Sequence, residues 1–145
     1  MLDRERILAK LDELDGYLRE LNAVVPETFS KYRRIETRRA CERLLQISIE
    51  AIIDICHLIV SGLRLGLPSE EDDIFERLAQ AGLISEEMKQ KLKRMKGLRN
   101  ILVHEYARVN DSIVFNTLKS ELGDFDEIRR VILRMLDQAR STTDF

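Results

Sequence analysis

The apolar residues of this chain recur at helical spacing along most of its length. In the first 22 residues they lie three or four positions apart, on the side of a helix that would pack against another helix. These residues are Ile7, Leu11, Leu14, Leu18 and Leu21. The pattern predicts a helix over residues 2–22 that forms part of an ordinary bundle rather than a free coiled coil.

The next stretch is longer and more apolar. Pro26 suits the first turn of a helix, which we extend to Arg64 and expect to be buried on most sides. One polar line interrupts it, formed by Arg39, Arg43, Gln46, Glu50, Asp54, His57, Ser61 and Arg64. This line is either a solvent or dimer-contact face, or the lining of an active site. Asp54 and His57 within it favour an acid–histidine hydrogen bond over a metal site, because the chain has no further His nearby.

Turn and cap residues divide the rest of the chain. Ser69 is the predicted N-cap of a short helix that ends near Gly82, and Ser85 is the predicted N-cap of a helix that ends near Arg108. A last helical region starts at Asp111, with a potential break at Gly123. We therefore predict an all-α, up-and-down bundle of four or five helices, in one domain that spans residues 1–145.

Composition supports this fold and limits the function. The chain has 145 residues, of which 44% are hydrophobic and 34% charged, with only six Gly and two Pro. The net charge of −2 argues against a broad nucleic-acid-coating surface. Basic residues cluster in segments 31–43 and 89–99, so any RNA should bind locally.

The first residues are charged and lead into an amphipathic helix, so they do not resemble a signal peptide. No uncharged stretch reaches membrane-spanning length, and we expect a cytoplasmic protein without membrane contact. Cys41 and Cys56 lie on one predicted helix, ~22 Å apart along its axis. That distance excludes a disulfide between them.

The candidate functional residues lie on the predicted helix that starts at Ser85. Five residues follow one face at steps of three or four, and they form a basic track that leads to an amide and an imidazole: Lys89, Lys93, Lys96, Asn100 and His104. Arg99 flanks this face, and its long side chain can reach the imidazole. Tyr106 lies on the same side as Arg99. Spacing alone favours the simpler interpretation that Arg99 and His104 are exposed polar residues near a helix end.

The chemistry that suits this group is cleavage of a phosphodiester. An imidazole can both accept and donate a proton near neutral pH. A guanidinium matches phosphate oxygens and stabilises charge that develops in a transition state. Asn100, one turn before His104, could orient the imidazole.

The segment Arg99–Tyr106, RNILVHEY, resembles the signature of the HEPN toxin family (HepT-like proteins), and segment 74–84 is also similar to that family. The resemblance implies a metal-independent ribonuclease that acts as a homodimer with two motifs facing one cleft. It makes Arg99 and His104 catalytic and Asn100 supportive. The basic track of Lys89, Lys93 and Lys96, placed by helix geometry, is the predicted RNA contact. The resemblance also implies a minimal nucleotidyltransferase antitoxin that adds AMP to Tyr106.

Two hypotheses remain open at this point. The first is the RNA endonuclease toxin, which requires no metal or other cofactor. Its single motif histidine favours a homodimer, because strand cleavage benefits from both an acid and a base. The alternative is a non-catalytic subunit that binds a nucleotide or substrate for a nucleotidyltransferase partner. Both predict affinity for phosphate, and only turnover of RNA separates them.

Overall fold

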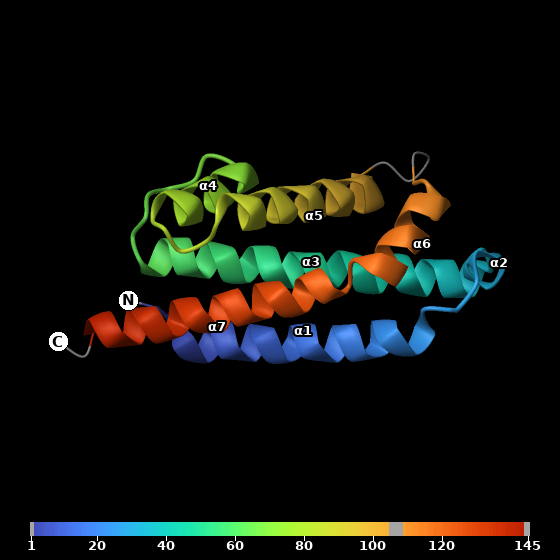
Figure 1. The fold of residues 1–145 in the computed structure, drawn as a ribbon, viewed down its shortest axis with the longest axis horizontal. Helices are drawn as coiled ribbons and strands as arrows, with labels where there is room; N and C mark the ends of the chain where they lie inside the picture. The colour runs from blue at the N-terminus through green and yellow to red at the C-terminus, as the bar shows by residue number, and fades with distance from the viewer. Residues whose placement is uncertain (1, 105–108, 144–145) are drawn as a thin grey trace.

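The structure, a computed structural model, describes residues 2–104 and 109–143. Within these residues all regular structure is helical, in seven helices. Four long helices form the bundle: α1 (Arg4–Val24), α3 (Ile35–Gly62), α5 (Glu86–His104) and α7 (Gly123–Thr143). They run alternately up and down, so that the first and last described residues lie at the same end (Figure 1). The all-α, up-and-down architecture predicted from the sequence is confirmed.

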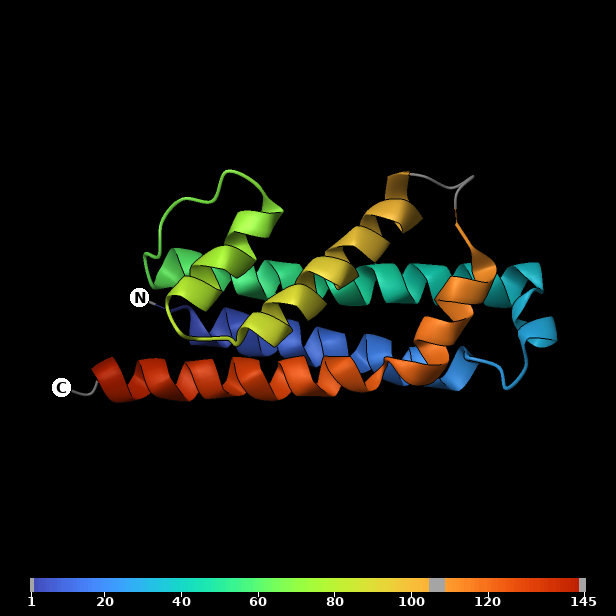
Figure 2. The same cartoon turned by 45° about the horizontal axis from the view of Figure 1, so that its top comes forward.

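Three short helices complete the molecule: α2 (Phe29–Tyr32), α4 (Glu71–Gln80) and α6 (Asp111–Ser120). Helix α4 packs on α3 and α5 at the end where α5 begins, whereas α2 and α6 meet at the opposite end (Figure 2). The seven helices thus exceed the predicted four or five, because short helices fill the corners between the long ones.

Helix α3 occupies the centre of the bundle and contacts α1, α4 and α5. Its length and hydropathy would allow it to cross a membrane, although Glu50 and Asp54 interrupt its apolar sequence. Its apolar side chains are instead buried in the protein, including Leu45, Ile52 and Ile59 at 0–1% exposure. They join one hydrophobic cluster to which every helix contributes. Helix α3 is therefore best interpreted as the core helix of this bundle.

The predicted helix from Pro26 to Arg64 is wrong in its first turns. Thr28 caps α2 by accepting a hydrogen bond from the Lys31 N–H at 3.3 Å. The chain then turns at Arg34, whose extended backbone (φ −61°, ψ 132°) precedes α3. Aromatic packing explains the turn, since the Phe29 ring lies 6.3 Å from Tyr32 and 5.7 Å from Phe115 of α6.

Other predicted boundaries have mixed outcomes. The predicted cap at Ser69 is wrong: Glu70 occupies the N-cap of α4, and Ser69 donates its N–H to the Asp73 carboxylate at 3.0 Å. Gly82, with φ +74°, ends the α4 segment as expected for a glycine after a helix. The break at Gly123 separates α6 from α7, as predicted.

Candidate active site on the motif helix

Helix α5 places the candidate residues, and its own sequence explains why it forms. Ser85 caps it, as predicted, by accepting a hydrogen bond from the Met88 N–H at 3.0 Å. Glu86 and Glu87 stand in its first turn, where carboxylates favour the helix dipole. Its core face comprises Met88, Leu92, Met95, Leu98 and Leu102, all of which are buried or half-buried. Because this face is buried against the core, the polar residues of α5 are fixed on its remaining faces.

Arg99 is held by groups from three helices. Its side chain is only 13% exposed. One terminal nitrogen pairs with the Glu71 carboxylate of α4, the other lies 4.0 Å from Glu50 Oε1 of α3, and Nε donates to Asn100 Oδ1 at 3.0 Å. The guanidinium is thus oriented by two carboxylates and one amide.

Asn100 consequently supports Arg99 in this structure, whereas the sequence had suggested that it orients His104. His104 is exposed and is the last residue of the described part of α5. Among the described residues, the hydrogen-bond and ion-pair partners of Arg99 do not include His104. Within one chain, the two groups do not meet directly.

Tyr106, which the resemblance marks as the modified residue, falls in segment 105–108 and lies outside the described residues. The predicted end of the helix near Arg108 falls in the same segment.

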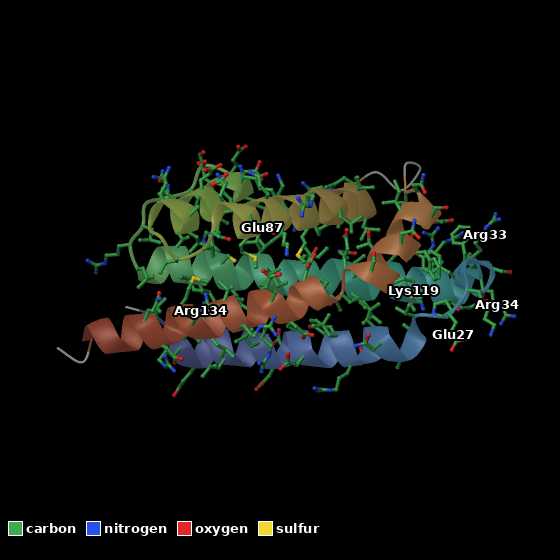
Figure 3. The ribbon with its side chains drawn as sticks, in the orientation of Figure 1. Glu27, Arg33, Arg34, Glu87, Lys119 and Arg134 are labelled. Carbon is green, nitrogen blue, oxygen red and sulfur yellow. The ribbon has the colours of Figure 1, made fainter. Side chains whose placement is uncertain are left out.

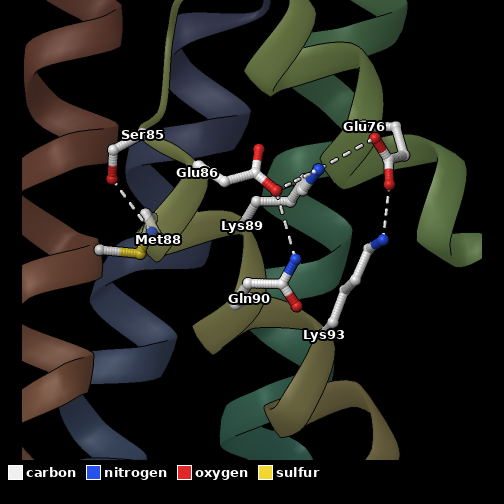
Figure 4. A network of polar contacts seen from close by, with 7 residues as sticks. All are labelled: Glu76, Ser85, Glu86, Met88, Lys89, Gln90 and Lys93. Atoms are coloured by element: carbon white, nitrogen blue, oxygen red, sulfur yellow. Dashed lines mark hydrogen bonds and ion pairs between the residues drawn. The ribbon is translucent and has the colours of Figure 1, made fainter.

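The three lysines of the predicted RNA track all face carboxylates of α4. Lys89 Nζ lies 3.2 Å from Glu76 and 2.7 Å from Glu86, as Figure 4 shows, and Lys93 Nζ lies 2.5 Å from the other oxygen of Glu76. Lys96 Nζ lies 2.7 Å from Asp72 Oδ1. Hydrogen bonds from Lys93 and then Lys89 hold the pKa of Glu76 below its ordinary value. RNA would have to displace a carboxylate to use these lysines.

The polar residues that form a line along α3 lie in two different environments. Glu50 approaches Arg99 and accepts a hydrogen bond from Gln46 at 3.1 Å, so this part of the line borders the candidate site. Asp54 instead pairs with Lys10 of α1 at 3.4 Å, and both Asp54 and His57 are exposed. The expected partly buried Asp54–His57 contact is therefore wrong. In the described part of the chain no group of three His, Cys, Asp or Glu side chains could hold a metal.

Sequence reasoning missed the acidic side of this site. Glu71, Asp72 and Glu76 of α4 together engage Arg99 and the three track lysines. A signal was present, because an acidic run precedes the basic helix. That α4 folds back against α5 depended on packing of Ile74, Phe75 and Leu78 into the core.

Known proteins resemble this chain in sequence. A family model described as ribonuclease HepT-like matches residues 8–132. The mRNA nuclease HepT of Shewanella oneidensis is 42% identical over 88 residues, a region covering 61% of this chain and 66% of that protein. The tRNA nuclease HepT of Aphanizomenon flos-aquae is 29% identical over 120 residues, or 82% of each chain.

A solved structure shows the same arrangement of helices. It is the tri-AMPylated Shewanella oneidensis HEPN toxin in complex with an MNT antitoxin, which superposes with a TM-score of 0.83 at 32% identity. The superposition covers 92% of this chain and 99% of that toxin. Because the family model spans most of the chain and the fold agrees throughout, this protein belongs to the HepT-like ribonuclease family.

Proposed function

We propose that this chain is the toxin of a toxin–antitoxin pair and that it cleaves RNA with Arg99 and His104. The observation that carries the proposal is the HepT-like ribonuclease match over residues 8–132, which includes the whole motif helix. The nearly buried, oriented guanidinium of Arg99 on that helix supports the assignment. A cytoplasmic location suits an enzyme whose substrate is cellular RNA.

The chemistry requires only protein groups and the RNA itself. The ribose 2′-hydroxyl attacks the adjacent phosphorus while neutral His104 accepts the hydroxyl proton. As the P–O5′ bond breaks, a protonated histidine donates a proton to the departing 5′-oxygen. The products are a 2′,3′-cyclic phosphate and a 5′-hydroxyl. Arg99 stabilises the charge that develops on the non-bridging oxygens, and Asn100 keeps its guanidinium oriented.

A homodimer supplies the second proton-transfer group. His104 is exposed at the end of α5 and, within the described chain, is not among the partners of Arg99. A two-fold pairing would bring His104 of a second copy to the same phosphate, and one imidazole would then act as base and the other as acid. Lys89, Lys93 and Lys96 would join RNA binding after exchanging their α4 carboxylates for phosphates.

The partner that fits is a minimal nucleotidyltransferase antitoxin. The similar Shewanella toxin is described as tri-AMPylated and in complex with an MNT antitoxin. In this chain Tyr106 would receive AMP, and the added phosphate would compete with RNA for Arg99. Mass spectrometry of Tyr106 after co-expression with the partner tests this step, and an unmodified tyrosine in a fully inactive complex would refute it.

Cleavage of RNA by the purified protein tests the whole proposal. The wild type should cut RNA in the presence of EDTA and leave cyclic phosphate ends, while His104→Ala should be inactive, Arg99→Ala should be severely slowed, and both should stay folded. Their helical circular dichroism and melting temperature provide the folding control. Wild-type cleavage rates in His104→Ala would reject the assignment. Phosphate binding without any turnover would favour the non-catalytic alternative, a subunit that presents a nucleotide or substrate to the transferase.

A further inference from the structure

An open hollow lies at the end of the bundle where α2 joins α3. Its volume is about 500 Å³, it is open to solvent, and it is lined by Phe29, Ser30, Arg33 and Arg34. The hollow belongs to the first basic segment of the sequence, which the proposed catalytic site does not use.

The cations around the hollow lack carboxylate partners. In the described residues, the exposed side chains of Lys31, Arg33 and Arg34 form no ion pair, although exposed Glu27 and Glu36 stand close to them in sequence. Lys119 lies nearby, as Figure 3 shows, and it donates to the Pro26 carbonyl at 3.3 Å rather than to an acid. The four cations therefore present net positive charge to solvent.

Their neighbours later in the segment are different. Arg38 lies 3.5 Å from Asp111, and Arg39 lies 2.8 Å from Glu42. The unpaired state is thus not shared by the whole basic segment, and the cations beside the hollow are among those that keep it.

One wall of the hollow is aromatic. Phe29 is half-buried, and its position is fixed by contacts with Tyr32 and Phe115 at centroid distances of 6.3 and 5.7 Å. A fixed ring suits the stacking of a nucleic-acid base, and guanidinium forks suit phosphate. The Ser30 hydroxyl adds a group that can bond a ribose hydroxyl.

The hollow also lies toward the same end of the bundle as the proposed catalytic group. The end of α5, where His104 lies, points toward the end of the bundle occupied by α2 and α6 (Figures 1 and 2). A strand whose scissile phosphate is at His104 can therefore continue toward α2.

We propose that this hollow is a second RNA subsite, which binds one nucleotide of the single strand flanking the cleavage point. Arg33 and Arg34 bind its phosphate, and the base stacks on Phe29. Lys31 and Lys119 attract the strand without contacting a particular base. The inference rests on the proposed nuclease function for its biological role, but the subsite itself is tested by binding.

The test compares two double variants in a His104→Ala background, which keeps the RNA intact. Arg33→Ala/Arg34→Ala removes the phosphate ligands. The matched control, Arg130→Ala/Arg134→Ala, removes two exposed arginines of α7. Fluorescence anisotropy with a labelled oligouridylate measures affinity over a salt series. The hollow variant should lose affinity by about tenfold, and its salt slope should fall by about 0.7, because both arginines bind the same phosphate. Equal affinity and slope in both variants would overturn the subsite.

A third variant separates stacking from charge. Phe29→Leu should weaken binding by about fivefold while leaving the salt slope unchanged, because a base contact releases no counterion. Its melting temperature shows whether the α2–α6 packing survives. An unaltered affinity in a folded Phe29→Leu protein would remove the base-stacking part of the proposal.

Two further outcomes separate RNA binding at the hollow from protein docking and from catalysis. If the arginine variant binds RNA normally but loses its nucleotidyltransferase partner, the hollow is a protein-docking surface and the RNA subsite is wrong. If the wild type never cleaves RNA but the arginine variant still loses RNA affinity, the subsite is supported and the nuclease proposal fails.

Discussion

The cations of α5 and those beside α2 differ in what neutralises them. On α5, Arg99, Lys89, Lys93 and Lys96 all pair with carboxylates that belong chiefly to α4. At α2, Arg33 and Arg34 line an open hollow and have no ion-pair partner among the described residues. The first region is oriented and electrically balanced, and the second is exposed and positive.

This difference fits a division of labour between the proposed catalytic group and the proposed RNA subsite. A guanidinium that acts in catalysis has to be held in one orientation, and carboxylate and amide partners hold Arg99 in this way. A residue that captures an RNA strand gains more from an unscreened charge, because its affinity comes from releasing counterions. We therefore expect changes on α5 to act mainly on the cleavage step and changes at α2 mainly on RNA affinity.

The largest expected effect is on Arg99. Arg99→Ala should lower kcat by about 10²–10³-fold, the usual cost of removing one group that stabilises transition-state charge. Arg33→Ala/Arg34→Ala should instead raise KM and leave kcat within about twofold, since it acts before the chemical step. Single-turnover cleavage over a range of protein concentrations separates the two constants. A kcat loss of similar size in both variants would abolish the distinction between the regions.

Removing the carboxylates of α4 that face α5 should leave cations of α5 without ion-pair partners, as the cations beside α2 already are. A triple variant, Glu71→Gln, Asp72→Asn and Glu76→Gln, removes the α4 partners of Arg99, Lys93 and Lys96, while Lys89 keeps Glu86. RNA affinity should rise about tenfold, and the salt slope should steepen by about 1.4 as Lys93 and Lys96 gain phosphates. The matched control is Asp12→Asn/Glu13→Gln/Glu20→Gln, which neutralises three exposed acids of α1. Weaker RNA binding in the α4 variant would show that the acids organise the site rather than compete with RNA.

The contrast between the regions also marks what the sequence can predict. Helical periodicity located the four long helices, and the cap at Ser85 fixed the register that puts Arg99 and His104 near one end of α5. Both basic segments are visible in the sequence as runs of positive charge. The sequence does not show which of these cations pair with carboxylates, because Glu71 and Arg99 lie 28 positions apart and meet only through packing of α4.

The turn before α3 was hidden for a similar reason. Pro26 and a long helix-compatible segment favoured one continuous helix, yet packing of Phe29 and Tyr32 on Phe115 redirects the chain at Arg34. That aromatic contact joins residues distant in sequence, and it includes Phe29, which lines the hollow. Local propensity cannot report such a contact.

A smaller effect is expected for the lysines of α5. Lys89→Ala/Lys93→Ala removes two cations that pair with Glu76 and, for Lys89, also with Glu86. RNA affinity should change by less than about threefold, well below the change at Arg33 and Arg34, because these lysines can bind phosphate only after they leave their carboxylate partners. Anisotropy under identical salt conditions compares the two double variants directly. A loss equal to that of the α2 variant would restore the basic track of α5 as the main RNA contact.

The smallest effect concerns the pH dependence of the α4–α5 contact. Lys93 and Lys89 lower the pKa of Glu76, so the folded state binds its proton less readily than the unfolded chain. Stability from this contact is present above the ordinary glutamate pKa and is lost as pH falls through the lowered value. Between about pH 5 and pH 3, the wild-type melting temperature should therefore fall a few degrees more steeply than that of Glu76→Gln. Glu87→Gln provides the control, because Glu87 is exposed and forms no ion pair within the described chain. If the melting temperatures of Glu76→Gln and the wild type fell in parallel with pH, the ion pairs of Glu76 with Lys89 and Lys93 would not contribute to stability.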